Sequence, residues 1–168
     1  MTRVLALLVL VGCGSSAPAA APGPAKDAED LLAPYVKVHF GDAIDAVRAA
    51  RPALEPGYVS GTKAEFLDLH DASGAMVSFE TEDGHVRTVG LEWHGEPANA
   101  AERTVRARLP PPRECSTLAG VEDFKSLLWQ LPDGASATAM RKGKTWRLTV
   151  SRPAADDFSA FYESCKAP

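Results

Sequence analysis

The stretch GAMVSFETEDGHVRTVGLEW, residues 74–93, decides the fold class. Apolar side chains occupy alternate positions on both sides of its centre, which is typical of strands that bury one face. Between the two runs, Glu82-Asp83-Gly84 predicts a tight turn, because Asp-Gly accepts the positive φ angles of a short hairpin loop. The stretch therefore predicts an antiparallel hairpin of strands 74–82 and 85–93. The alternating apolar residues are Ala75, Val77, Phe79, Val89, Leu91 and Trp93.

The same patterns extend outward from this hairpin. We expect a further strand at 63–70 and a second hairpin of strands 135–141 and 144–151. Helical spacing of apolar residues predicts a short helix or turn from 28, although 36–40 also alternates as a strand would. Further helices are expected at 42–50, 98–109, 121–131 and 154–165, and the Pro/Gly-rich residues 51–62 are expected to form a loop. These elements predict a single α+β domain over 28–168. It has a small antiparallel sheet of about five strands, with the helices packed on one face.

The two halves of the chain are similar in outline. Each contains a hairpin and a helix, and the turn glycines Gly84 and Gly143 fall at comparable places. A duplicated unit is one interpretation. One continuous sheet layer without duplication is the interpretation we favour, because the residues do not match and the first half has an extra strand.

The amino-terminal segment indicates export. A short positive head ending at Arg3 precedes eight apolar residues, 4–11, too few to span a bilayer but enough for a signal peptide. Leu10-Val11-Gly12-Cys13 resembles the lipobox of bacterial lipoproteins. The resemblance implies removal of residues 1–12, diacylation of Cys13 and stable anchoring in a membrane. The alternatives are a secretory signal with an incidental cysteine, or an amino-terminal helix that is not removed. Gly14, in place of Asp, favours the outer membrane by analogy with Gram-negative sorting.

The composition after the anchor excludes some classes of partner. Residues 13–27 comprise the lipidated cysteine and an Ala/Pro/Gly-rich tether with little to bury. The formal net charge is −4, and removal of Arg3 with the signal segment would make it −5. An acidic chain of this kind is not expected to bind nucleic acid, nor to hold anionic lipid through a polybasic patch.

Two cysteines are left after lipidation, Cys115 and Cys165. In an exported protein, such a pair most simply forms one disulfide bond, which here would connect the last helix to the chain after the triple proline at 110–112. Two free thiols or a redox-active pair are the alternatives. The spacing is unlike that of a Cys-x-x-Cys redox motif.

The strongest candidate for catalytic chemistry is the string around Asp68, His70 and Asp71. On a strand, Asp68 and His70 would share a face and could bind a metal or act as an acid–base pair. A solvated strand end followed by a turn explains the same residues, and we favour that interpretation. His85 and His94 lie at opposite ends of another predicted strand, too far apart to bind one ion.

Three other patterns have a functional and a structural interpretation. Four arginines near one helix end could bind an acidic partner or the phosphates of lipopolysaccharide, or they could be a solvated helix face, which we favour. Residues 142–145 contain the Gly-Lys-Thr of a phosphate loop, but the first glycine of the motif is missing, which favours a hairpin turn. The tryptophans could stack a ligand, but their apolar faces favour core packing. The arginines are Arg103, Arg106, Arg108 and Arg113, and the tryptophans are Trp93, Trp129 and Trp146.

Together these observations predict a non-catalytic binding or adapter module, anchored to a membrane of the bacterial cell envelope and facing the periplasm. Its partner would be a protein or a cell-wall component, and no cofactor or metal is expected. A hydrolase or metal-dependent enzyme using Asp68 and His70, and a small inhibitor or ligand-binding protein, are the alternatives. The string from Phe79 to Val86 resembles small outer-membrane assembly lipoproteins, but it implies no site residues.

Overall fold

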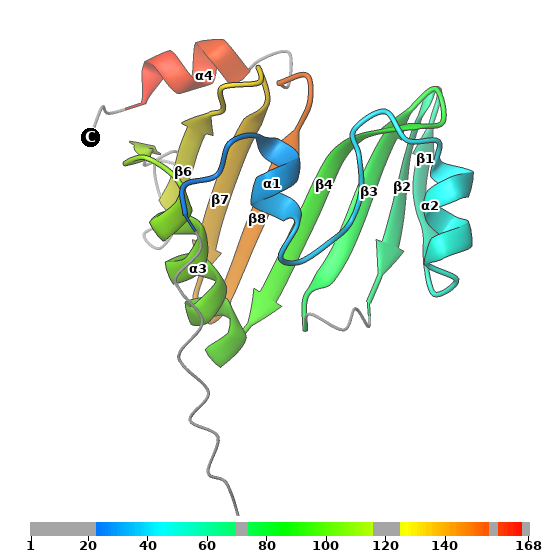
Figure 1. Ribbon diagram of the computed structural model, residues 1–168, viewed down its shortest axis with the longest axis horizontal. Coiled ribbons are helices and arrows are strands. Elements are labelled where there is room, and N and C mark those ends of the chain that lie inside the picture. The colour runs from blue at the N-terminus through cyan, green and yellow to red at the C-terminus, as the bar shows by residue number, and fades with distance from the viewer. Residues whose placement is uncertain (1–22, 70–73, 116–124, 155–157, 166–168) are drawn as a thin grey trace, which may run out of the picture.

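A computed structural model describes residues 23–69, 74–115, 125–154 and 158–165. Its described strands form one antiparallel sheet in the order β1-β2-β3-β4-β8-β7-β6-β5 (Figure 1). The mixed helix and strand content and the single antiparallel sheet confirm the predicted class. The strands are β1 Glu55–Ser60, β2 Lys63–Asp68, β3 Met76–Glu82, β4 His85–His94, β5 Arg113–Cys115, β6 Lys125–Gln130, β7 Ser136–Lys142 and β8 Thr145–Ser151. The helices are α1 Ala28–Leu32, α2 Ile44–Ala50, α3 Glu96–Arg108 and α4 Phe158–Ser164.

The sheet consists of two four-stranded meanders joined at their last strands. The first is β1 to β4, preceded by α2, and the second is β5 to β8, preceded by α3. The last strands, β4 and β8, pair antiparallel in the middle of the sheet, with Gly90 opposite Thr149. The described strands thus form one continuous sheet layer, as the favoured interpretation of the sequence predicts, and the duplicated unit stays a prediction.

One face of the sheet carries the main core and is covered by α1, α2 and α3. The apolar positions of the 74–93 hairpin and of β8 are buried on this face, as their alternation predicts. Helix α3 packs on β4 and β8, and its buried side chains include Ala98, Ala101 and Val105. We call this side the helix-covered face and the opposite side the open face.

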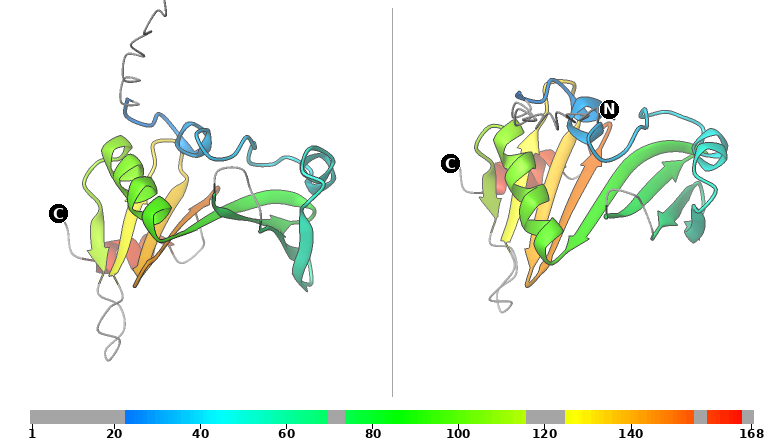
Figure 2. Two further views of the ribbon diagram at one scale, coloured as in Figure 1. Left: turned by 90° about the horizontal axis from the view of Figure 1, so that it is seen from below. Right: turned by 60° about the horizontal axis from the view of Figure 1, so that its bottom comes forward.

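The prediction that all helices pack on one face is wrong for α4. Along β6, Leu127 and Trp129 belong to the main core, whereas Leu128 between them points to the opposite side. There Leu128 packs with Phe158 of α4 and with the cysteine pair, which form a separate small cluster. Figure 2 shows α3 and α4 on opposite sides of the strands at this end of the sheet.

The described part of the chain contributes eight strands to the sheet, not the predicted five, because three of these strands lack a clear alternating pattern in the sequence. Strand β1 lies in the predicted loop 51–62, contains Pro56 and Gly57, and exposes all six residues at the edge of the sheet. Strand β5 has only three residues. Strand β6 falls in the predicted helix 121–131, of which residues 121–124 lie outside the described part. Both faces of β6 are buried, so its apolar residues are consecutive and fit a helical spacing as well.

Candidate functional site

The predicted disulfide is present between Cys115 of β5 and Cys165, directly after α4. The two Cα atoms are 4.9 Å apart, and both residues are buried next to Leu128 and Phe158. Arg113 strengthens the same junction, since its guanidinium donates to the Tyr162 carbonyl over 3.0 Å and lies over the Tyr162 ring. The disulfide therefore has a structural position, holding α4 against the sheet.

Asp68, the first residue of the candidate catalytic string, is part of a buried ion pair. Its side chain is 8% exposed, and its carboxylate accepts a hydrogen bond of 3.3 Å from the Arg51 guanidinium. Arg51 in turn lies over the Phe79 ring, 5.8 Å from its centre. His70 and Asp71 lie outside the described residues. The described contacts give Asp68 a structural role, connecting the segment after α2 to the end of β2.

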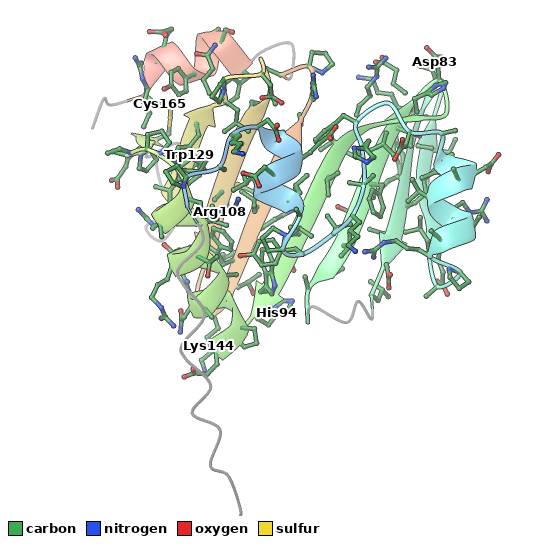
Figure 3. The ribbon with its side chains drawn as sticks, in the orientation of Figure 1. Asp83, His94, Arg108, Trp129, Lys144 and Cys165 are labelled. Carbon is green, nitrogen blue, oxygen red and sulfur yellow. A yellow bond between two sulfur atoms is a disulfide. The ribbon has the colours of Figure 1, made fainter. Side chains whose placement is uncertain are left out.

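The structure separates the four arginines of the predicted partner surface. Arg108, at the carboxyl end of α3, is 6% exposed and points toward α1 (Figure 3). Its guanidinium pairs with the Asp30 carboxylate at 3.0 Å and donates to the backbone carbonyls of Gly23, Asp30 and Leu31. These contacts fix α1 and the segment that precedes it to α3. Arg108 is therefore not accessible to a partner.

The other three arginines do not form one surface either. Arg113 is occupied at the α4 junction, where it also pairs with Glu163 at 3.3 Å. Arg106 pairs with Glu102 one helical turn before it. Arg103 and Arg106 remain exposed on α3. The predicted four-arginine surface is thus reduced to two exposed side chains on one helix.

Glu102 connects α3 to the sheet. Arg141 of β7 donates to its carboxylate through Nε at 2.8 Å and also through Nη2, and Arg106 donates at 3.0 Å. Burial by itself would raise the pKa of Glu102. The hydrogen bonds and charges of Arg141 and Arg106 outweigh burial and hold that pKa below its usual value. The folded protein therefore favours the charged carboxylate.

Glu102→Gln is expected to lower the free energy of unfolding at pH 7 by about 1–2 kcal/mol, the range for a partly exposed hydrogen bond with charged partners. Because the folded pKa is lowered, the stabilisation is complete above the unfolded value of about 4.3 and is lost as pH falls through the folded pKa. Urea unfolding of the parent protein and the variant from pH 7 to pH 3 should show that the difference between their free energies of unfolding becomes smaller as the pH falls. In an Arg141→Gln background, most of the effect should be absent. A difference that stays constant with pH would contradict the assignment.

Other candidates from the sequence occupy structural positions. The three tryptophans are buried in the main core, where the rings of Trp93 and Trp146 stack and the Trp129 indole donates to the Pro110 carbonyl over 2.8 Å. The Gly-Lys-Thr sequence forms the β7–β8 turn, with Gly143 at a φ of 57°. His85 and His94 lie at the two ends of β4, as expected.

A cluster of charged residues joins α1 to the loops beside it. Glu29 of α1 accepts from His39 Nδ1 at 2.7 Å and lies 3.8 Å from Arg152, which is 3.7 Å from Asp133. The hydrogen bond and charge of Glu29, with the charge of Asp42, raise the pKa of His39. The cluster borders a shallow hollow of about 480 Å³ that includes Arg152 and Asp133. Among the described residues, the charges of this cluster pair with one another, so the cluster connects loops.

A hollow with a volume of about 650 Å³ lies on the open face, across β2, β3, β4 and β8. Glu65 of β2 and Glu80 of β3 are direct cross-strand partners in its floor. Tyr58 of β1, 66% exposed, lines one side, and Pro153 and Ala154 line another. We call this site the open-face hollow.

The charges in the open-face hollow are unevenly paired. Glu82 lies 4.0 Å from Arg87, and Lys63 is the cross-strand partner of Glu82. Glu65 and Glu80 have no ion pair with any other described residue. Like charges directly opposite each other on neighbouring strands are unfavourable. Lys63 and Arg87 line the same hollow as Glu65, Glu80 and Glu82, so the glutamates of the lining exceed its cations by one.

Sequence reasoning did not identify this hollow. The alternation of 63–70 and 74–82 does place Glu65 and Glu80 on the solvent side of their strands. Strand β1 was predicted to be part of a loop, so Tyr58 had no predicted position relative to these two glutamates.

Comparison of the chain with protein-family models, with curated proteins and with solved structures finds no match. Within the described residues, no helix combines the length and the apolar character needed to cross a membrane. The same part of the chain contains no group of three or more His, Cys, Asp or Glu side chains placed to hold a metal ion.

Proposed function

We propose that the protein is a lipid-anchored, non-catalytic binding module of the bacterial cell envelope, attached through Cys13 to the periplasmic side of the outer membrane, and that it binds a protein partner through its open face. The observation that carries this proposal is the uneven covering of the sheet. Three helices cover one face, whereas α4 is the only described helix on the other and reaches only the β5–β6 end.

The start of the domain supports this orientation. The Ala25 backbone amide donates to the Arg108 carbonyl over 2.9 Å, and Arg108 Nε donates to the Gly23 carbonyl over 3.3 Å. The segment that would lead to the anchor therefore enters along the end of α3, on the helix-covered face. The open face lies on the other side of the sheet, free for a partner in the periplasm.

The side chains of the open face also support binding. Along its central strands they are partly exposed and mostly polar, including Thr88, Glu92, Arg147 and Thr149. A polar surface of this kind is compatible with a non-obligate protein interface, which is about as polar as the rest of a protein surface. The small inhibitor or ligand-binding protein remains the second candidate, and the open-face hollow is the observation that favours it.

The anchor is tested by metabolic labelling and fractionation of cells that express the full chain. We expect labelled palmitate in the protein and its recovery with outer membranes. Cys13→Ser should abolish the label and release the protein, because one thioether-linked diacylglycerol at that sulfur provides the attachment. A labelled Cys13→Ser variant, or a wild-type chain without label, would overturn the lipoprotein assignment.

The open face is tested by photo-cross-linking in intact envelopes. A photoreactive amino acid replaces Thr138 or Thr149 on the open face, and Ala100 or Ala107 on exposed positions of α3 serves as the matched control. We expect both open-face positions to give the same protein adduct and both helix positions to give none. The reverse pattern, or no adduct at 138 and 149, would count against the proposed function.

A further inference from the structure

We propose that the open-face hollow binds an arginine side chain of the protein partner, with Glu65 and Glu80 contacting the guanidinium and Tyr58 stacking on it. This inference rests on the proposed function and specifies the chemistry of the partner. It names one anchor residue of the interface, in a hollow that lies on the face left open by the helices.

The charge arrangement determines the sign of the occupant. Glu65 and Glu80 face each other across paired strands, and side chains in such a pair lie roughly 5 Å apart at Cβ. The two cations of the lining, Lys63 and Arg87, both lie next to Glu82, so the hollow keeps an excess of negative charge at Glu65 and Glu80. A cation placed between them would relieve their repulsion, whereas an anion would add to it. The hollow is therefore complementary to a positive group.

The position of the Glu65 carboxylate follows from Gly57 on the neighbouring edge strand. A Cβ atom at position 57 would lie 3.4 Å from Glu65 Oε2, so the carboxylate lies directly over this glycine. Tyr58 is the next residue along β1. The irregular pairing between Pro56 and Val59 leaves both Gly57 and Tyr58 opposite Glu65, and Tyr58 and Glu65 line the same hollow, where a cation would contact both.

The exposed tyrosine favours arginine over other cations. Tyr58 and its neighbour Val59 are 66% and 65% exposed, and they are two of the three large apolar side chains that the described chain exposes strongly. A guanidinium is planar, stacks on an aromatic ring and donates in two directions, so it can contact two carboxylates and the ring together. The volume of about 650 Å³ accommodates the side chain and part of its backbone.

The first experiment uses a defined probe, the capped peptide acetyl-Gly-Arg-Gly-amide, added to the full-length protein in a neutral detergent. Backbone amide NMR signals of residues 58, 63–65 and 80–82 should shift with a millimolar dissociation constant. The peptide with citrulline in place of arginine has the same shape without the charge, and it should bind at least tenfold more weakly. Equal binding of the two peptides, or shifts that do not include the hollow, would overturn the inference.

Two double variants test whether peptide binding depends on the carboxylates of the hollow or only on the overall negative charge of the protein. Glu65→Gln with Glu80→Gln should weaken the arginine peptide at least tenfold, and it should fold normally because it removes a repulsive pair. The matched control, Glu96→Gln with Glu114→Gln, removes two exposed carboxylates outside the hollow and should leave the affinity unchanged. Unchanged binding in the first double variant would overturn the inference.

The photo-cross-linking experiment then distinguishes this inference from the proposed function. If arginine binding is confirmed, the Thr149 adduct should be reduced at least fivefold in the Glu65→Gln, Glu80→Gln variant. If the adduct persists at full strength while the peptide does not bind, the open face is an interface but the arginine hollow is wrong. If neither the adduct nor peptide binding is found, both proposals are wrong.

Discussion

Replacement of Arg108 by methionine is expected to lower the free energy of unfolding by about 3–5 kcal/mol, because backbone carbonyls that accept from its guanidinium lose their donor, at about 1–3 kcal/mol for each buried group left unsatisfied. The guanidinium is 6% exposed and satisfies three backbone carbonyls as well as the Asp30 carboxylate. Methionine keeps most of the side-chain volume but leaves these acceptors without their donor. Unpaired buried acceptors, and not the lost charge itself, account for most of the expected cost.

Arg106→Met is the matched control, since it removes one arginine from the same helix turn. Arg106 is exposed and pairs with Glu102 in an i,i+4 geometry, which contributes about 0.5 kcal/mol or less. Urea unfolding of both variants at pH 7 provides the comparison. A similar loss of unfolding free energy in the two variants would contradict the structural role of Arg108, and Arg108 would again be a candidate for the partner surface.

The position of Arg108 could have been found in the sequence. It lies three residues after Val105 and seven after Ala101, so it continues the buried stripe of α3 on the side that faces α1. The prediction grouped four arginines by their shared charge, although helical spacing places Arg108 on the buried face of α3 and Arg103 and Arg106 on the exposed face. Charge alone does not distinguish a solvated side chain from one that satisfies buried carbonyls.

The strands that sequence reasoning recovered are those with one buried and one hydrated face. Alternation and the Asp-Gly turn located β3 and β4 to within two residues, and alternation on either side of the turn glycine Gly143 located β7 and β8. Strand β6 was not predicted because α4 buries its second face, and α4 lies about 30 residues further along the chain. Strand β1 was not predicted because neither of its faces is buried, so its sequence has no alternation of apolar and polar residues. In both cases the burial pattern is set by tertiary neighbours and is absent from the local sequence.

The candidate site follows the same logic. The Cys115–Cys165 bond was predicted correctly, because the two cysteines that remain when Cys13 is set aside allow a single pairing. The open-face hollow depends on the register of β2 against β3, which places Glu65 opposite Glu80, and on an edge strand next to them. Register is a property of the assembled sheet, and no local motif encodes it.

Removal of the disulfide by Cys115→Ala with Cys165→Ala is expected to lower the free energy of unfolding by about 4 kcal/mol. The bond closes a loop with a sequence separation of 50, and the chain-entropy treatment gives this value for a loop of that size. Urea unfolding of the full chain carrying Cys13→Ser measures it without a third thiol. The parent protein treated with reductant should match the double variant, and the double variant should not respond to reductant.

Without the disulfide, α4 should unfold locally under conditions in which the rest of the sheet stays folded. Helix α4 has seven residues, and its described apolar contacts with the sheet are confined to the small cluster around Phe158 and Leu128. This is too little buried surface to hold so short a helix without the covalent bond. Hydrogen exchange should therefore show the α4 amides of the double variant losing protection while those of β3, β4 and β8 keep theirs. Full protection of α4 without the disulfide would show that packing alone holds it against the sheet.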